Sequence, residues 1–495
     1  MKFPILIAAA LAALSLGAEV LDSESFKSNN GKWNVPSYWS GKLERATADG
    51  GALRLVSSTK KGKTFGRAYG DFKQRRSGYF AGEPLRLTVN AKGEGNFCAG
   101  LLVYKPGNPR PDYLRAKAQK LDGEYKDRVF NVTLPQRTFK VLPFFEVAGK
   151  GFAEVRTLRI ESSAAPGESV TAANGLQVVK SAADARPVVF RADPAEGELD
   201  FTQICGAKCE SRKIRSGEEV KPAELGPGLW ELAAARRGHR AICYIVCENP
   251  ADYDRSDALA RQVKIEKPLR ILILGDSLSD FYRGYNYIDR LQYWLDKYNP
   301  GKVSIRNAAV HGDFIRRVEY RLYDTHRGEK VSFEPDAYKG VFDDRYDLVM
   351  IFLGQNDTRT HGSQGFRAPI TDEATQRDGL EKILAFIRGR SNADIVLVSP
   401  SPSYEKGFMD RLAKGADPKK VVIFGKKEFV DAYDRVNREF CKAHGFDYID
   451  ILNPMRGVAD LKSLYQPDFV HLSPAGGRFV ADEILKYFIS RGGKR

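Results

Sequence analysis

The stretch LRILILGDS (residues 269–277) combines an apolar run with a turn that ends in a serine. After its arginine the run is continuous in Ile and Leu, as expected of a strand buried on both faces. Gly275 and Asp276 then break the strand, so that Ser277 stands just past its carboxyl end. Such strands belong to parallel sheets covered by helices, in which functional residues gather at the carboxyl ends of the strands. The stretch therefore predicts an α/β domain with a functional site near Ser277.

Around this stretch the sequence alternates between apolar strands and amphipathic helices. The further expected strands are apolar runs bounded by turn residues, at 303–309, 346–353, 394–399 and 446–452. The expected helices carry apolar residues on one face, at 289–297, 373–387, 426–444 and 473–490. This alternation predicts a three-layer α/β/α domain over residues 266–492, with a parallel sheet between two layers of helices.

The chain has 495 residues, which are too many for a single core and predict two to four domains. The part before the α/β domain is expected to be all-β. In residues 19–165, strand-like runs are separated by Gly, Pro, Asn and Asp clusters, at 52–57, 85–91, 97–104, 128–134, 140–147 and 155–161. Their even spacing predicts a jelly-roll β-sandwich and resembles the carbohydrate-binding modules of secreted polysaccharide enzymes. Trp33, Tyr38 and Trp39 are either a platform for sugar rings or packing residues.

A linker at 162–170 leads to a second, smaller β unit, expected at 171–262 with an Ig-like fold and strands at 187–191, 228–233 and 241–247. Four of the six cysteines form two matched pairs in this unit, Cys205 with Cys209 and Cys243 with Cys247. If the two segments pair antiparallel, disulfides would join Cys205 to Cys247 and Cys209 to Cys243 as two rungs. A four-thiolate zinc site and free thiols are the alternatives.

The amino-terminal residues 1–18 have the pattern of a secretory signal peptide. Lys2 precedes an apolar run from Phe3 to Leu16, and the small residues Gly17 and Ala18 follow. An amino-terminal membrane anchor is the alternative, but the run is too short to span a bilayer. No later stretch is long and apolar enough to cross a bilayer. We therefore expect a secreted or periplasmic protein without a transmembrane segment.

The chain is basic, with a net charge of +15 and a pI near 9.3. Such an exported protein is either simply well solvated or favours anionic polymers and cell surfaces. The sequence has no basic stripe with interleaved aromatic residues and no zinc-finger spacing of Cys and His, so no nucleic-acid partner is expected. Composition and motifs make no prediction of the oligomeric state.

Ser277 is a candidate nucleophile, since a serine that leaves a strand at a glycine-containing turn is exposed for attack. The alternative is a helix cap, and the surrounding residues do not match G-x-S-x-G. His471 is the only one of the six histidines that follows an acid by three residues. At that spacing Asp468 can bond to the imidazole Nδ1 and direct Nε2 toward the serine, which makes His471 a candidate base.

Acyl transfer by a serine also needs donors aimed at the developing oxyanion. Asn356 follows an apolar strand and offers its side-chain amide, while Gly312 and Ser277 offer backbone N–H groups. Gly and Asn are also ordinary turn residues, so both positions have a purely structural alternative. Shortly after Gly312, three arginines either meet an anionic substrate or lie on a solvated helix face: Arg316, Arg317 and Arg321. Near the expected site, His311 and His361 either shape the pocket or are ordinary loop residues.

Taken together, GDSL (275–278), Gly312, GQND (354–357) and DFVH (468–471) resemble the four sequence blocks of the SGNH hydrolases, the GDSL family of lipases and esterases. The second block departs from the family pattern, because AAVH (308–311) stands where a Gly-containing segment is usual. The resemblance covers roughly residues 266–492 and implies a flavodoxin-like fold with ester hydrolysis that needs neither metal nor cofactor. It also implies a catalytic set of Ser277, Asp468 and His471, and oxyanion donors at Ser277, Gly312 and Asn356.

With a signal peptide and a sugar-module-like β domain, the sequence predicts a secreted serine esterase. Its expected partner is a polysaccharide or glycan ester from which it removes O-acetyl groups. One alternative is an esterase of the lipase or lysophospholipase type. The other is a non-catalytic glycan-binding surface protein on a hydrolase scaffold.

Overall fold

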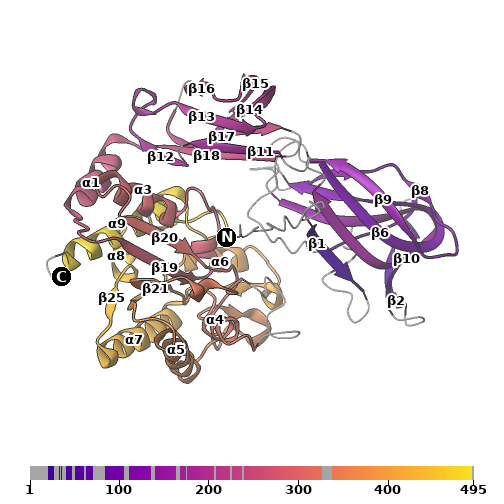
Figure 1. Cartoon of the computed structure of the whole chain (residues 1–495). Coiled ribbons are helices and arrows are strands. Elements are labelled where there is room, and N and C mark those ends of the chain that lie inside the picture. Colours follow the sequence, from indigo (N-terminus) through magenta and orange to yellow (C-terminus); the bar gives the residue numbers. More distant parts are fainter. Residues whose placement is uncertain are drawn as a thin grey trace, which may run out of the picture.

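The computed structural model describes residues 20–26, 33, 35, 41–46, 51–60, 63–70, 84–104, 111–134, 140–162, 168–173, 175–205, 208–222, 226–236, 239–325 and 337–492. The expected signal peptide, Tyr38, Trp39 and residues 163–167 of the expected linker lie outside these ranges. In sequence order the chain forms an amino-terminal β unit, a smaller β unit and a carboxyl-terminal α/β unit (Figure 1).

The amino-terminal β unit is one hydrogen-bonded sheet of ten strands. They are β1 (Val20–Ser25), β2 (Lys42–Ala46), β3 (Ala52–Val56), β4 (Ser58–Lys60), β5 (Lys63–Tyr69), β6 (Pro84–Tyr104), β7 (Asp112–Arg115), β8 (Gln119–Lys120), β9 (Lys126–Thr133) and β10 (Lys140–Ser162). The strands of each bonded pair run antiparallel. The all-β expectation is therefore confirmed for the described part of this unit.

Two of these strands are longer than the sequence predicts. β6 joins the expected strands 85–91 and 97–104, and β10 joins 140–147 and 155–161. Gly93 and Gly151 lie at an irregularity in the β6–β10 ladder, where a Cβ would come 2.0 and 1.9 Å from a carbonyl oxygen of the opposing strand. Glycines in this position permit a bulge inside a continuous strand, so reading them as strand ends is wrong.

Trp33 is a packing residue of this unit. Its side chain is 7% exposed and stacks on Phe145 with the ring centroids 4.3 Å apart. Phe26 contacts the same indole edge-on. The hypothesis that Trp33 forms part of a sugar platform is therefore wrong, because its face is covered by the core.

The smaller β unit consists of two sheets that enclose a core. One has the order β11-β13-β16, formed by β11 (Ser169–Ala173), β13 (Val188–Asp193) and β16 (Glu219–Val220). The other has the order β12-β18-β17-β14-β15, formed by β12 (Leu176–Val179), β14 (Glu198–Cys205), β15 (Lys208–Arg215), β17 (Gly228–Arg236) and β18 (His239–Cys247). A 3-10 turn, η1 (Ala182–Asp184), follows β12. Phe190 and Leu232 are fully buried in this core, one from each sheet.

The predicted disulfide ladder does not match this topology. Cys205 and Cys209 lie on β14 and β15, on the two sides of one hairpin, and β17 separates β14 from β18. All four cysteines of the two pairs are free in the structure, with Cys209 exposed and Cys243 buried. The assumption that the two segments pair with each other is wrong. The described residues also contain no group of three or more side chains suited to hold a metal ion, so the four cysteines do not form a thiolate cluster.

The carboxyl-terminal unit is built on a parallel sheet of five strands in the order β20-β19-β21-β23-β25. They are β19 (Leu269–Gly275), β20 (Val303–Asn307), β21 (Leu348–Phe352), β23 (Asp394–Val398) and β25 (Asp447–Ile449). The first strand of the unit lies between the second and the third, which is the flavodoxin-like order. The predicted fold class of this unit is therefore confirmed.

Helices cover both faces of the sheet. On one face lie α1 (Pro250–Gln262), α3 (Tyr287–Tyr298) and α9 (Pro474–Arg491); on the other lie α4 (Ile315–Leu322), α5 (Glu373–Arg388) and α7 (Lys427–His444). Because neighbouring side chains of a strand point to opposite faces, Ile271 and Ile273 of β19 join the first core, and Leu272 and Leu274 join the second. The remaining elements are short: α2 (Ser277–Asp280), η2 (Val341–Asp343), β22 (Thr360–His361), η3 (Gly362–Gln364), α6 (Glu405–Ala413), η4 (Pro418–Lys420), β24 (Val422–Ile423), α8 (Leu452–Arg456) and η5 (Leu461–Leu464).

Helix α1 corrects the expected extent of the smaller β unit. The Asn249 side chain accepts the N–H of Asp252 at 2.9 Å, and Pro250 occupies the first turn, so the helix begins directly after β18. Ala260 of α1 packs in the core beneath α3 and α9, and Ser256 Oγ donates to Asp482 Oδ1 of α9 at 2.6 Å. The expectation that the β unit extends to residue 262 is therefore wrong for residues 250–262.

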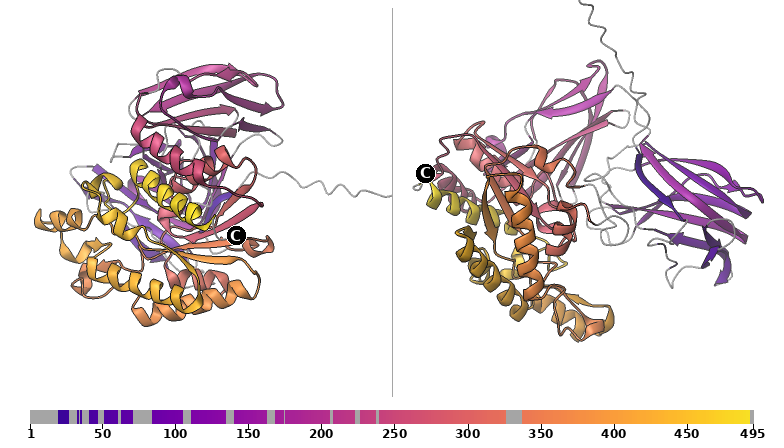
Figure 2. Two further views of the ribbon diagram at one scale, coloured as in Figure 1. Left: turned by 90° about the vertical axis from the view of Figure 1, so that its left-hand side faces the viewer. Right: turned by 60° about the horizontal axis from the view of Figure 1, so that its bottom comes forward.

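The smaller β unit packs on the layer that contains α3 (Figure 2). Val178 of β12 belongs to the core beneath α3, and the Tyr293 hydroxyl donates to the Val178 carbonyl oxygen at 2.9 Å. Just after β18, Glu248 forms an ion pair with Arg290 of α3, with side chains only 3% and 1% exposed. A buried charge pair thus connects the β unit to the α/β unit.

We expect Glu248→Gln to lower the free energy of unfolding by about 3–5 kcal/mol, because it leaves the buried Arg290 guanidinium without its counter-charge. Urea denaturation followed by circular dichroism measures the change. Glu483→Gln is the matched control, because Glu483 pairs with the exposed Lys486, and such a pair contributes about 1 kcal/mol or less. Equal effects of the two variants would contradict a stabilising role of the buried pair.

Among the described residues, no helix combines the length and the apolar character that crossing a bilayer requires.

Candidate active site

Ser277 stands where the sequence predicts it, directly after β19 at the first position of α2. Asp276 caps this helix, with its Oδ1 accepting the N–H of Leu278 at 3.0 Å. As the first helical residue, Ser277 has no acceptor for its own N–H within the helix. The local fold therefore fixes the serine and leaves one backbone donor available beside its side chain.

The structure brings His471 and Asp468 to this serine across 194 positions of sequence. His471 Nε2 lies 2.9 Å from Ser277 Oγ, and His471 Nδ1 lies 2.6 Å from Asp468 Oδ2. The other carboxylate oxygen accepts the N–H groups of Val470 and His471 at 2.9 and 3.0 Å. Serine, imidazole and carboxylate thus form a continuous hydrogen-bonded chain, the arrangement that lets a histidine take a proton from a serine.

The environment of Asp468 favours its charged form. Burial acts to raise the pKa of this carboxyl, but the hydrogen bond and charge of His471, with the two backbone N–H groups, outweigh burial and hold the pKa below its ordinary value.

The loop that carries Asp468 and His471 is anchored on both sides. Gln466 N–H donates to the His471 carbonyl oxygen at 2.7 Å, and Ser473 caps α9 by accepting the N–H of Gly476 at 3.1 Å.

Gly312 and Asn356, the two further candidate oxyanion donors, lie next to the serine turn. Gly312 has φ +77°, a left-handed conformation that favours glycine, and its N–H donates to no acceptor among the described residues. The Asn356 amide nitrogen donates to Asp276 Oδ2 at 3.3 Å. Ser277 follows β19 and Asn356 follows β21, and these adjacent strands flank the switch point of the sheet.

Asp276 therefore contacts both the serine turn and the asparagine. It is 1% exposed, and burial raises its pKa to about 7, assisted by the charges of Asp357 and Asp313. Its second oxygen fixes the orientation of the Asn356 amide. The sequence identified Asp276 only as a turn or capping residue, and no motif signals this second contact.

A pocket lies beside Ser277, lined on one side by several residues between Leu278 and Tyr287 and on the other by Gln466 and residues 471–474. Phe281 stands against the imidazole, with its ring centroid 4.5 Å from that of His471. Tyr282 and Tyr285 form the aromatic wall of the pocket. Sequence reasoning missed these three residues, because they follow no spacing that distinguishes a pocket wall from a loop.

The smaller β unit supports this wall from outside. The ring of Tyr244, on β18, lies 4.8 Å from that of Tyr285. At Gly284 a Cβ would come 2.5 Å from the Tyr244 ring, so only glycine permits the approach. The smaller β unit therefore contributes to the shape of the site without lining the pocket.

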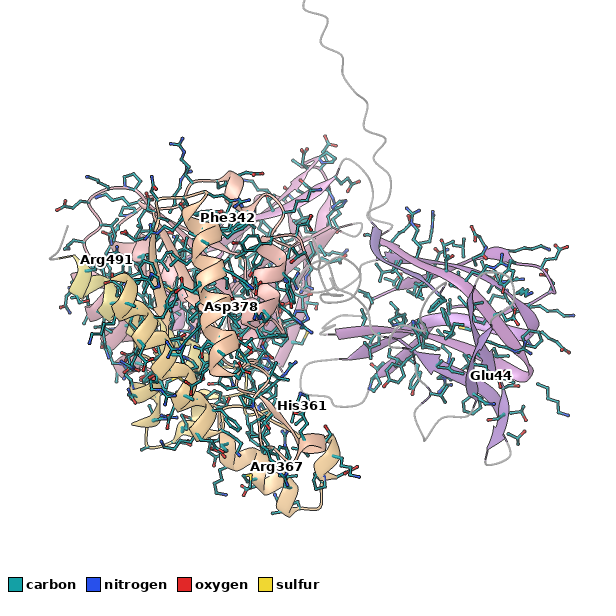
Figure 3. The ribbon with its side chains drawn as sticks, turned by 90° about the horizontal axis from the view of Figure 1, so that it is seen from below. Glu44, Phe342, His361, Arg367, Asp378 and Arg491 are labelled. Carbon is teal, nitrogen blue, oxygen red and sulfur yellow. The ribbon has the colours of Figure 1, made fainter. Side chains whose placement is uncertain are left out.

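A small lobe holds the Asp468–His471 loop from the other side. It is formed by β22, β24 and α6, and Figure 3 labels His361 and Arg367 in this part of the chain. Val470 packs with Phe408 and Ile423 in the core of the lobe. His361 pairs across β22 and β24 and is not among the residues that line the pocket.

The three arginines that follow Gly312 have different partners. Arg321 is buried and forms two hydrogen bonds to Asp313, at 2.7 and 3.1 Å. Arg316 pairs with Glu319 and Asp378. Arg317 instead donates to the Gly312 carbonyl oxygen at 2.9 Å.

His311 belongs to a second His–Asp pair. Its Nδ1 lies 3.0 Å from Asp280 Oδ2, and its ring centroid lies 5.3 Å from that of Phe281. The pair stands next to the site, but this imidazole bonds to Asp280 and not to Ser277.

The region that contains the four blocks matches a known protein family. Residues 273–479 match the model of the GDSL-like Lipase/Acylhydrolase family. A GDSL esterase/lipase, CPRD49, of Arabidopsis thaliana is 23% identical over 141 residues, which are 28% of this chain and 53% of that protein. The chain thus spans about half the length of this curated relative.

Two solved structures are similar to part of this chain. A lipase/acylhydrolase from Enterococcus faecalis is 21% identical, with a TM-score of 0.34, over 45% of this chain and 96% of that one. An acetyl xylan esterase, AlAXEase, is 19% identical, with a TM-score of 0.33, over 44% of this chain and 99% of that one. The match to the family model, over the region that holds all four blocks, gives the assignment: residues 273–479 are a hydrolase domain of the GDSL-like lipase/acylhydrolase family.

Proposed function

We propose that the chain is a secreted serine esterase that hydrolyses short acyl esters, namely the O-acetyl groups of a polysaccharide or glycan. The observation that carries the proposal is the hydrogen-bonded chain from Ser277 Oγ to His471 at 2.9 Å and on to Asp468 at 2.6 Å. A serine in this environment has a general base in contact and a carboxylate that orients the base.

The reaction proceeds in two half-reactions. His471 Nε2 takes the Ser277 proton while Oγ attacks the ester carbonyl carbon, and the N–H groups of Ser277 and Gly312 and the Asn356 amide stabilise the oxyanion. His471 then protonates the departing alcohol, which leaves an acyl-enzyme. Water, deprotonated by His471, attacks the acyl carbon, and Ser277 Oγ leaves with the proton.

The apolar surface of the chain favours a small acyl group over a lipid. In the described ranges the exposed large hydrophobic residues are Val129, Tyr323, Ile370 and Met409, and none of them lines the pocket at Ser277. A lipid esterase needs a contiguous apolar surface next to its nucleophile. The apolar surface next to Ser277 is thus confined to the pocket wall, where it includes the rings of Tyr282 and Tyr285, and this limited extent supports an acetyl ester as the substrate.

A substrate panel tests this function. Acetate release from acetylated xylan, hydrolysis of 4-nitrophenyl acetate and hydrolysis of a 4-nitrophenyl ester with a long acyl chain separate the alternatives. We expect hydrolysis of both acetyl substrates and little hydrolysis of the long-chain ester. Preference for the long chain would indicate a lipase. Binding of xylan without acetate release would indicate a glycan-binding protein on a hydrolase scaffold.

Asn356→Ala is expected to lower kcat for 4-nitrophenyl acetate by about 10²–10³-fold with a small change in KM, because an oxyanion donor acts mainly on the transition state. Steady-state kinetics measure the two parameters. Asn453→Ala is the control, because the Asn453 side-chain amide donates to Asp450 at 2.8 Å at the start of α8 and bonds to none of the catalytic residues. Loss through KM alone would contradict the proposed role of Asn356.

A further inference from the structure

Two arginines border the proposed oxyanion donors. Arg317 Nη1 donates to the Gly312 carbonyl oxygen at 2.9 Å, and Arg359 Nη1 donates to Asn356 Oδ1 at 3.2 Å. Within the described part of the chain, neither guanidinium has a carboxylate in ion-pair contact. The positive charges of Arg317 and Arg359 are therefore not balanced by a direct ion pair. The neighbouring Arg321, in contrast, pairs with Asp313.

The two guanidinium groups also act on each other. Burial lowers the pKa of Arg359, and the positive charge of Arg317 lowers it further against the opposing charge of Asp357, so the two guanidinium groups are close enough to repel. In addition, Arg359 Nε is buried and has no hydrogen-bond acceptor. Buried donors are normally satisfied, and two neighbouring like charges are stabilised by an anion between them.

We propose that Arg317 and Arg359 bind an anionic group of the substrate, a carboxylate or a sulfate, beside the ester that Ser277 attacks. The proposal rests on the serine esterase function above and defines its substrate class as an acylated acidic glycan. Guanidinium groups suit this role because their planar set of N–H donors matches the oxygens of carboxylate and sulfate. The net charge of +15 would also attract a polyanion to the protein.

The competing explanation is that the arginines only position Gly312 and Asn356. In that case their loss would slow the hydrolysis of every ester by the same factor. An anion site instead predicts a loss that depends on the charge of the substrate, so the ratio of kcat/KM for acidic and neutral esters separates the two.

The experiment uses the full chain and four substrates. They are 4-nitrophenyl acetate, O-acetylated galacto-oligosaccharides, O-acetylated oligogalacturonates and O-acetylated sulfated galacto-oligosaccharides. We expect one acidic glycan to have a higher kcat/KM than the neutral glycan. The acidic glycan that does so shows whether the arginines bind a carboxylate or a sulfate. Arg317→Gln should reduce this preference by about 10- to 100-fold, the effect of losing a hydrogen bond to a charged group.

Three controls sharpen the result. Arg317→Lys and Arg359→Lys keep the charge and should retain most of the preference. Arg316→Gln removes a neighbouring arginine that pairs with Glu319 and Asp378, and it should leave the preference unchanged. Added sodium chloride should reduce the preference of the wild type, because it screens a charge interaction.

A wild type without preference for either acidic glycan, or an Arg317→Gln protein that loses activity equally on neutral and acidic esters, would overturn the anion site. Failure of the esterase function gives a different result, namely no hydrolysis of any of the four substrates. In that case, calorimetric titration of the Ser277→Ala protein with unacetylated oligogalacturonate and with sulfated galacto-oligosaccharide still tests the arginines. Binding that Arg317→Gln abolishes supports the site, and absence of binding overturns it.

Discussion

Ser277→Ala is expected to lower kcat for 4-nitrophenyl acetate by about 10⁴-fold or more, because it removes the hydroxyl that contacts His471 and would form the acyl-enzyme. Residual turnover above that of water would come from the oxyanion donors and from substrate binding alone. The variant should also lose the initial burst of 4-nitrophenol that an acyl-enzyme produces. Stopped-flow absorbance measures the burst, and steady-state assays measure kcat.

Ser279→Ala is the matched control for this variant. Ser279 lies two positions further in the same short helix and is buried, but its hydroxyl pairs with Tyr287 rather than with His471. We expect it to keep turnover and to lose about 1 kcal/mol of stability with its hydrogen bond. Wild-type hydrolysis by Ser277→Ala, or equal losses in both variants, would contradict the assignment of the nucleophile.

Asp468→Asn is expected to lower kcat by about 10⁴-fold although it changes little in shape. The asparagine oxygen would still accept the N–H groups of Val470 and His471, as Asp468 Oδ1 does at 2.9 and 3.0 Å. Its NH2 group would then face His471 Nδ1 at the position of Oδ2. The imidazole would have to accept there and carry its proton on Nε2, where it could not take the proton of Ser277.

The pH profile distinguishes this effect from a general loss of structure. Because the pKa of Asp468 lies below its ordinary value, the carboxylate keeps its charge as pH falls through the range in which an ordinary carboxyl group would take up a proton. Protonation of Asp468 should therefore not limit wild-type activity until the pH lies below the usual titration range of a carboxyl group. The loss in Asp468→Asn should persist at all pH values, since a wrong tautomer is not corrected by raising the pH.

The second His–Asp pair of the site provides the control for Asp468→Asn. Asp280→Asn alters the contact with His311, whose Nδ1 lies 3.0 Å from Asp280 Oδ2, without touching the pair that faces Ser277. Its effect on kcat should be far smaller. An equal loss in both variants would show that the two pairs act only by holding the loops in place.

The strands and the four blocks were predictable because local signals define them. The apolar run of 269–274 became β19, and the expected helix 373–387 became α5 (Glu373–Arg388), whose start Asp372 caps. The long strands β6 and β10 were not predictable, because a glycine in a bulge and a glycine in a turn have the same sequence context. The disulfide prediction failed for a related reason: matched spacing does not reveal that β17 inserts between β14 and β18.

The sequence by itself determined the α/β alternation, the position of Ser277 after its strand and the residue types that ester hydrolysis needs, since strand, turn and capping preferences act over a few residues. The meeting of His471 with Ser277 was expected from the four blocks, but only the tertiary structure decided that Arg359 meets Asn356 and that Tyr244 meets the loop that lines the pocket. Such contacts join segments from different strands and units. Their geometry follows from strand order and packing, which the preferences of residues close together in the sequence do not specify.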